Sequence, residues 1–238
     1  MHYLATIVGG ESGPSAAPGT PEFDAGVAKY AAFQEQAAAA IAGGAALYPS
    51  ATAVNIRGGG EGETLITDGP FTEQNEVVTG FYVFDCANLD EAIQLARKIP
   101  AAARGSIEVR PMQMWLPHST PGADWWLALL WSPQGDFVAP DTPEWDTMAA
   151  AHQRFVDQAG PAIQGGGALR PPTEATIVRE RDGALLLTDG PFTEGAEVVD
   201  GLYVFTAASP ARAGEIGARI PRGEKGRTEL RRIVDVGF

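Results

Sequence analysis

The residue best suited to proton transfer is a histidine in the second half of the chain. His152 lies in the run Ala-Ala-Ala-His-Gln-Arg-Phe, where the spacing of apolar residues predicts a helix. An imidazole has an ordinary pKa of about 6.5, so it can accept or donate a proton near neutral pH. A histidine on a partly exposed helix face without chemical function fits the same pattern, and the sequence leaves both interpretations open.

Two aspartates could act together with such a base. Asp68 and Asp189 each precede a Gly-Pro pair at the end of a predicted strand. Their carboxylates could accept backbone N–H groups within the turn, which is a structural role. Alternatively, they could face a cleft and orient a base or take up a proton. We expect Asp189 to orient His152, and Asp68 to contribute to substrate binding. Glu73 and Glu194, five residues further on, are expected to be loop or surface groups.

Other side chains that could shape a pocket differ between matched positions of the two halves. We expect four of them to bind substrate beside Asp68: Tyr30, Tyr48, Trp145 and Arg170. When the two halves are aligned, Tyr30 corresponds to His152, Tyr48 corresponds to Arg170, and Phe23 corresponds to Trp145. Only the second half has a titratable base at the helix position, so it is the favoured location of a working site.

Composition excludes several function classes. The chain has 30 acidic and 17 basic residues, a net charge of −13 that opposes binding to nucleic acid. It has one cysteine, Cys86, and three histidines without metal-ligand spacing, so we expect no metal or organic cofactor. No apolar run approaches the roughly 20 residues of a membrane span, and no secretory signal is evident. We therefore expect a cytoplasmic protein whose partner is a small molecule.

An internal repeat decides the organisation of the chain. Residues 67–84 read TDGPFTEQNEVVTGFYVF and residues 188–205 read TDGPFTEGAEVVDGLYVF, with 14 identities in 18 positions. Because the match extends in both directions, we predict two homologous domains at residues 1–117 and 123–238. The stretch between them contains Pro, Ser and Gly, as a linker does.

Each half is predicted to contain the element order β-α-β-β-β-α-β. Thr-Pro-Glu at residues 20–22 and 142–144 is typical of a helix start, with Thr as N-cap and Pro at the first helical position. Predicted hairpins precede both repeated segments, and a second helix ends before Pro100 and Pro221. This order gives an α+β unit with helices on one face of an antiparallel sheet. The other face needs a partner, and the second copy supplies it, so we expect the halves to pack sheet to sheet.

The repeated segment resembles a known family. Thr-Asp-Gly-Pro-Phe-Thr-Glu, followed by an acid, an apolar pair and Gly-x-Tyr-Val-Phe, is similar to the YCII-related or DGPF domain. The resemblance implies two tandem ferredoxin-like units forming an intramolecular pseudo-dimeric α+β barrel, since single-domain relatives are dimers. The best-understood enzyme of the wider family removes chloride from a chlorinated hydroxyquinol without a cofactor. Others are proposed to use a His/Asp pair, and those with a functional histidine carry it on the helix that holds His152.

Two functions remain open at this point. The first is a cofactor-independent lyase or isomerase that moves protons on a small aromatic or enolisable molecule, with His152 and Asp189 as catalytic residues. The second is a non-catalytic small-molecule-binding or stress-linked accessory protein. A fused pseudo-dimer also need not associate further, so we expect a monomer or a weak homodimer.

Overall fold

The structure is a computed structural model that describes residues 1–11, 20–58, 64–69, 76–192 and 197–235. Within these residues the chain forms twelve strands and four α-helices. Each half has one strand more than predicted, because the glycine-rich segments Ile41–Ala46 and Ile163–Leu169, expected only to end the first helix of each half, form strands. The first half contains β1 (His2–Gly9), α1 (Pro21–Ala37), β2 (Ile41–Ala46), β3 (Val54–Arg57), β4 (Leu65–Asp68), β5 (Val77–Asp85), α2 (Leu89–Ala96) and β6 (Ser106–Leu116). The second half contains β7 (Trp125–Pro133), α3 (Pro143–Ala159), β8 (Ile163–Leu169), β9 (Thr176–Arg181), β10 (Ala184–Asp189), β11 (Glu197–Thr206), α4 (Pro210–Ala218) and β12 (Arg227–Arg232).

The long helices begin where the sequence predicts. The Thr20 hydroxyl accepts a hydrogen bond from the Phe23 backbone N–H at 3.3 Å, and proline follows at the first helical position. Thr142 does the same for the N–H of Trp145 at 3.2 Å. These caps satisfy donors that have no partner inside a helix, and they fix the start of α3, which carries His152.

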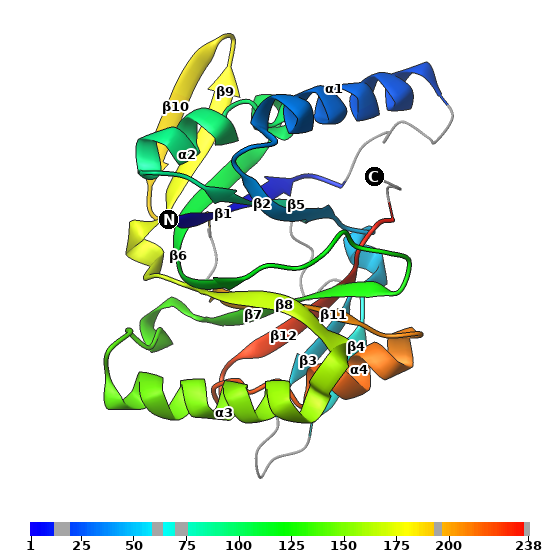
Figure 1. The fold of residues 1–238 in the computed structure, drawn as a ribbon, viewed down its shortest axis with the longest axis vertical. Helices are drawn as coiled ribbons and strands as arrows, with labels where there is room; N and C mark the ends of the chain where they lie inside the picture. The colour runs from blue at the N-terminus through cyan, green and yellow to red at the C-terminus, as the bar shows by residue number, and fades with distance from the viewer. Residues whose placement is uncertain (12–19, 59–63, 70–75, 193–196, 236–238) are drawn as a thin grey trace.

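The strands form two antiparallel layers, with the helices on the outer faces. One layer has the order β2-β5-β1-β6-β9-β10 and the other β8-β11-β7-β12-β3-β4, and β6 pairs with β8 where the layers meet. Figure 1 shows α1 and α2 above the strands and α3 and α4 below them. None of the described helices has the length and apolarity needed to cross a membrane.

The expected packing of sheet against sheet is confirmed. A core of buried side chains from both halves fills the space between the layers and includes Leu4, Phe81, Val83, Trp115, Trp125, Leu127, Leu202 and Val204. Two further cores lie between each sheet and its own helices. The fold is therefore a duplicated α+β barrel with three apolar cores.

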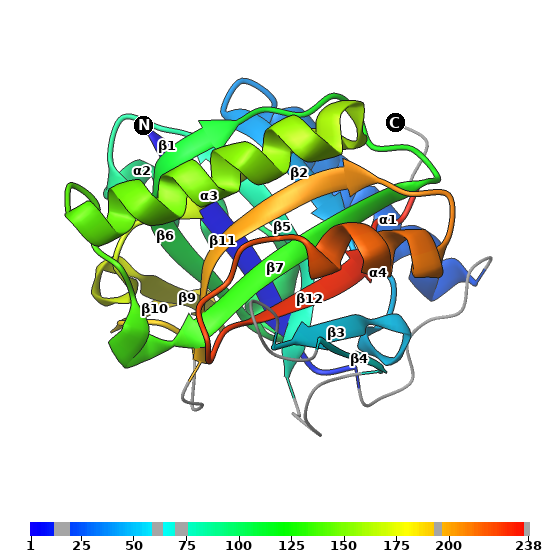
Figure 2. The same ribbon diagram turned by 90° about the horizontal axis from the view of Figure 1, so that it is seen from below.

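The two halves exchange their hairpins, which the sequence does not reveal. The β3–β4 hairpin of the first half pairs through β3 with β12, aligning Val54 with Leu230. The β9–β10 hairpin of the second half pairs through β9 with β6, aligning Val178 with Ile107. Figure 2 shows β3 and β4 beside β12 and α4. Each Asp-Gly-Pro-Phe segment thus follows a hairpin that belongs to the sheet of the other half.

The exchange predicts that the halves stay together after the chain is cut. A protease site placed in the linker at residues 117–122 should be cleaved without dissociation, because both hairpin ladders and the shared core remain. Size-exclusion chromatography of the nicked protein should give one species of about 25 kDa. Two separating fragments would contradict the exchanged pairing.

Candidate functional site

A cavity of about 390 Å³ lies between α3 and the second sheet. From α3 it is lined by Trp145, Met148, His152 and Val156. The facing strands contribute Leu130 and Trp131 of β7 and Asp200, Leu202 and Tyr203 of β11. Figure 2 shows α3 running alongside β11, with β7 next to it. Apolar walls with a few polar groups are typical of sites for small molecules.

The central polar feature of this cavity is a hydrogen-bonded pair. His152 Nδ1 and the Tyr203 hydroxyl are 2.9 Å apart, and which of them donates depends on the histidine tautomer. Burial lowers the pKa of His152 to about 4 and raises the pKa of Tyr203 to about 12. Both groups are therefore neutral at neutral pH. Because Tyr203 occupies Nδ1, Nε2 is the ring nitrogen that a bound molecule can use.

The glycine-rich strand β8 lets Tyr203 reach this position. A Cβ on Gly166 would lie 2.7 Å from the Leu202 carbonyl oxygen and 3.0 Å from Cδ1 of Tyr203. Those distances are too short for an alanine unless the neighbouring groups shift. Gly166 therefore allows close strand packing beneath the tyrosine ring, whereas Gly165 and Gly167 allow a close approach to His118 and to β6.

Asp200 and the exposed Asp136 both line the cavity, and the sequence reasoning missed both. Asp200 is the more enclosed carboxylate. It lies in the β-bulge of β11 between Val199 and Gly201. Burial raises its pKa, while a hydrogen bond from Ser132 and the charge of Arg110 act in the opposite direction. Its Oδ1 atom is buried and has no hydrogen-bond partner in the described part of the chain. The repeat could have pointed to Asp200, because the two 18-residue segments differ at only four positions, and one of these has Asp200 where the first half has Thr79.

The structure does not form the expected pair of His152 and Asp189. Asp189 is exposed at the end of β10, opposite Thr176, in the sheet of the first half. The hairpin exchange carries it there, away from the residues that line the cavity. Asp68 is likewise exposed at the end of β4. Neither carboxylate has a hydrogen bond within the described residues, so neither shows the expected turn-capping contact.

Of the four other expected binding residues, only Trp145 lines the cavity. Tyr30 packs against the first helix-side core, where its hydroxyl bonds to the Ala101 backbone and burial raises its pKa to about 12. Tyr48 is exposed, with the Arg232 guanidinium 5.2 Å from its ring centre. Arg170 forms a surface ion pair with Glu174 at 2.8 Å.

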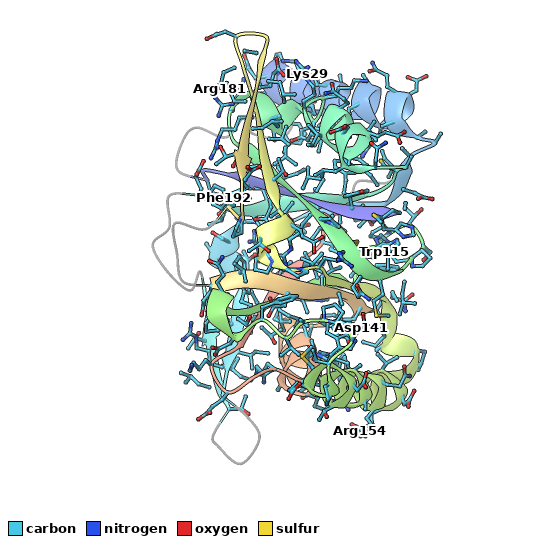
Figure 3. The ribbon with its side chains drawn as sticks, turned by 90° about the vertical axis from the view of Figure 1, so that its left-hand side faces the viewer. Lys29, Trp115, Asp141, Arg154, Arg181 and Phe192 are labelled. Atoms are coloured by element: carbon cyan, nitrogen blue, oxygen red, sulfur yellow. The ribbon has the colours of Figure 1, made fainter. Side chains whose placement is uncertain are left out.

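The remaining sequence candidates lie outside the cavity or outside the described residues. Arg154, two residues from His152, is exposed on the outer side of α3 (Figure 3). Glu73 and Glu194 fall outside the described residues. In the described part of the chain, no three His, Cys, Asp or Glu side chains are grouped so that they could hold a metal ion.

The first half helps to build one wall of the cavity. The Arg227 guanidinium lies 4.5 Å from the centre of the Trp131 ring, a cation–π contact. Arg227 also bonds to Glu197 at 2.7 Å and to Asn55, on the exchanged hairpin, at 3.2 Å. The exchanged hairpin therefore holds a side chain that lines the cavity of the second half.

The low pKa of His152 predicts a pH-dependent loss of stability. Its folded pKa of about 4 lies below the unfolded value of about 6.5, so below pH 6.5 the unfolded chain takes up a proton that the folded chain does not. Between pH 7 and pH 4 the free energy of unfolding of the wild type should fall by up to roughly 3 kcal/mol more than that of His152→Gln. Urea unfolding at both pH values measures the difference. Parallel pH curves for the two proteins would contradict the buried, neutral imidazole.

Comparisons with known proteins agree with the repeat. The YCII-related domain matches residues 4–116 and again residues 133–236. An uncharacterized protein of Rhizobium meliloti (strain 1021), R00369, is 44% identical over 79 residues, which is 32% of this chain and 63% of that protein. The chain thus spans less than two thirds of that relative's length.

A solved structure provisionally described as a chlorite dismutase, TA0507, can be superposed over 99% of this chain and 95% of its own. The TM-score is 0.43 and the identity 11%, values that add nothing to the fold described above. The YCII-related match is of a different kind, because it covers most of the chain in two consecutive copies. The chain therefore belongs to the YCII-related family and carries two copies of its domain.

Proposed function

We propose that the protein is a cofactor-independent enzyme that moves protons on a small aromatic or enolisable molecule bound in the α3 cavity. One observation carries the proposal: a neutral His152, held by Tyr203, lines an apolar cavity that is also lined by the half-buried carboxylate of Asp200. The volume of about 390 Å³ lies within the range of roughly 300–1,000 Å³ found for small-molecule sites. Isomerisation, elimination and cyclisation are the reactions that such an arrangement serves.

His152 acts as the base in the tautomer whose Nδ1–H donates to Tyr203. Nε2 then carries a lone pair that accepts a proton from an acidic O–H, or from a C–H next to a carbonyl. The low pKa of His152 results from burial, which disfavours the imidazolium. An enolate or phenolate forming beside the ring offsets that penalty, so proton transfer is favoured when both charges form together. Tyr203 takes the orienting role expected of Asp189, because its hydroxyl holds Nδ1 of the imidazole.

The first half lacks this combination of groups. Tyr30 replaces His152 and bonds to the backbone of Ala101, while Thr79 replaces Asp200 and its hydroxyl is 3.5 Å from the Ile7 carbonyl oxygen. A phenol whose pKa is about 12 stays protonated at neutral pH and is a poor base. These differences favour a single working site, in the second half.

Activity should depend on His152 and not on its counterpart. Enolisable aromatic ketones and hydroxyquinols, incubated with the protein in D₂O, allow deuterium uptake or product formation to be followed by NMR. His152→Ala should lower turnover by about 10²–10⁴-fold, the usual contribution of a positioned base. Tyr30→Phe and Asp189→Asn are matched controls that should retain activity. Equal losses in His152→Ala and Tyr30→Phe would contradict the proposed site.

Filling the cavity should abolish ligand binding without unfolding the protein. His152→Tyr introduces the side chain that already occupies the matching helix position in the first half, so the helix should tolerate it. Calorimetric titration should show lost binding of any ligand from the panel, and circular dichroism a retained melting transition. His152→Ala should lose turnover and keep binding, whereas a protein that only binds would show no turnover in any form.

A further inference from the structure

Small residues on neighbouring strands form the floor of the α3 cavity. Gly201 of β11 pairs with Ala168 of β8, and Tyr203 pairs with Gly166. Residues directly opposite each other in an antiparallel pair point to the same side of the sheet, and the bond from Tyr203 to His152 shows that this side faces α3. Three of these four positions therefore present little or no side chain to the helix. Their small size leaves a trough across the sheet, which the cavity occupies.

The first half supplies one end of this trough. Met114 and Leu116, near the end of β6, pair with Ala168 and Gly166, and both line the cavity. Although they are apolar, their side chains are 49% and 47% exposed. The trough thus opens at β6 onto an apolar rim formed by Met114 and Leu116.

The matching position in the other half is polar. Glu-Val-Arg at residues 108–110 aligns with Glu-Leu-Arg at residues 229–231 in the repeat. Four residues after these arginines, Met114 corresponds to Asp235, which is exposed. An apolar side chain at this place is therefore a feature of the second half's cavity and not of the repeat.

The trough also continues towards β7. There Gly201 pairs with Leu130, which lines the cavity as well. Neighbouring strands lie about 4.8 Å apart, so a row across β6, β8, β11 and β7 spans roughly 14 Å. Because α3 runs alongside β11, this row passes beneath the helix (Figure 2). A single aromatic ring occupies only part of a site of that length.

The end of the cavity beyond β7 is polar. Ser132 of β7 and Asp136, which follows that strand, line it together with Lys225. Lys225 Nζ and Asp136 Oδ2 are 3.1 Å apart, and both side chains are exposed. His152, which bonds to β11 through Tyr203, lies between this end and the apolar rim, because β11 lies between β7 and β6 in the sheet. The cavity therefore changes from apolar to polar across the sheet.

We propose that the ligand of the α3 cavity is amphipathic, with a polar group beside His152 and an apolar chain that runs over Ala168 to Met114 and Leu116. Such a molecule is the substrate class of the proposed enzyme, so this inference rests on the proposed function. Contact with the trough removes the chain from water, which stabilises the complex in proportion to the buried length. The unbranched Met114 side chain adapts to chains of different shape.

A series of phenyl ketones tests this ligand class. Acetophenone, butyrophenone, hexanophenone and octanophenone share the same enolisable head group and differ in the length of the alkyl chain. Calorimetric titration should show binding that tightens about threefold to fourfold for each CH₂ group that the trough buries. Ala168→Phe fills the trough between His152 and β6. This variant should bind acetophenone as the wild type does and should lose the gain of the longer ketones.

Two further variants examine the rim. Met114→Asp introduces the residue type of the other half and should weaken octanophenone binding about tenfold relative to acetophenone. Leu186→Asp is the matched control, because Leu186 is 48% exposed on β10 and does not line the cavity. It should keep the dependence on chain length.

Three results would each overturn the proposal: affinities that do not rise with chain length, a rise kept in both Ala168→Phe and Met114→Asp, or a rise lost in Leu186→Asp. His152→Ala should keep the dependence of binding on chain length and lose turnover. Failure of the proton-transfer mechanism is therefore distinguishable from failure of the ligand class.

Discussion

The antiparallel pairing of each hairpin with the last strand of the other half is the contact on which the rest of the structure depends. Through β3 and β12, and through β9 and β6, each sheet is completed by strands from a distant part of the chain. The same pairing brings Asn55 to Arg227, and Arg227 to the wall of the cavity. It also removes Asp189 from the neighbourhood of His152. The location of the functional groups therefore follows from this exchange more than from the order of elements within one half.

The sequence predicts local structure well because local signals are strong. Thr20 and Thr142, each followed by proline, mark the start of both long helices, and the repeat gives the number of units. The glycine-rich strands β2 and β8 carry no strand signal in the sequence, so the predicted element order lacks them. The unpartnered apolar face of each sheet predicts the shared core. Strand pairing is different, because alternation of apolar and polar residues shows which face of a strand is buried and not which strand lies beside it. The exchange of hairpins could therefore not be derived from the sequence. Because the exchange places Asp189 in the sheet of the first half, the expected pair of His152 and Asp189 does not form.

The cavity was predictable only in part, for a related reason. His152 and Trp145 stand out because they replace Tyr30 and Phe23 in an otherwise similar helix. Asp200 differs from Thr79 in the same way, but it lies in a β-bulge, where the side chain no longer follows the alternation of the strand. Tyr203 does not stand out at all, because Tyr82 occupies the matching position. The role of Tyr203 depends on its hydrogen bond to His152, and the first half has no histidine at the matching position.

Different segments of the repeat have diverged to different extents between the two halves. The heptapeptide Thr-Asp-Gly-Pro-Phe-Thr-Glu is identical in both copies, whereas His152, Trp145 and Asp200 of the cavity are replaced by other residue types in the first half. Each heptapeptide begins on the second strand of an exchanged hairpin, so both copies serve the architecture even if only one half performs chemistry. The first half is thus not free to diverge in its hairpin, because Asn55 on that hairpin bonds to Arg227 at the wall of the second half's cavity. In this chain the shared motif thus starts on strands whose pairing holds the two halves together, and the residues that distinguish the second half's cavity lie outside it.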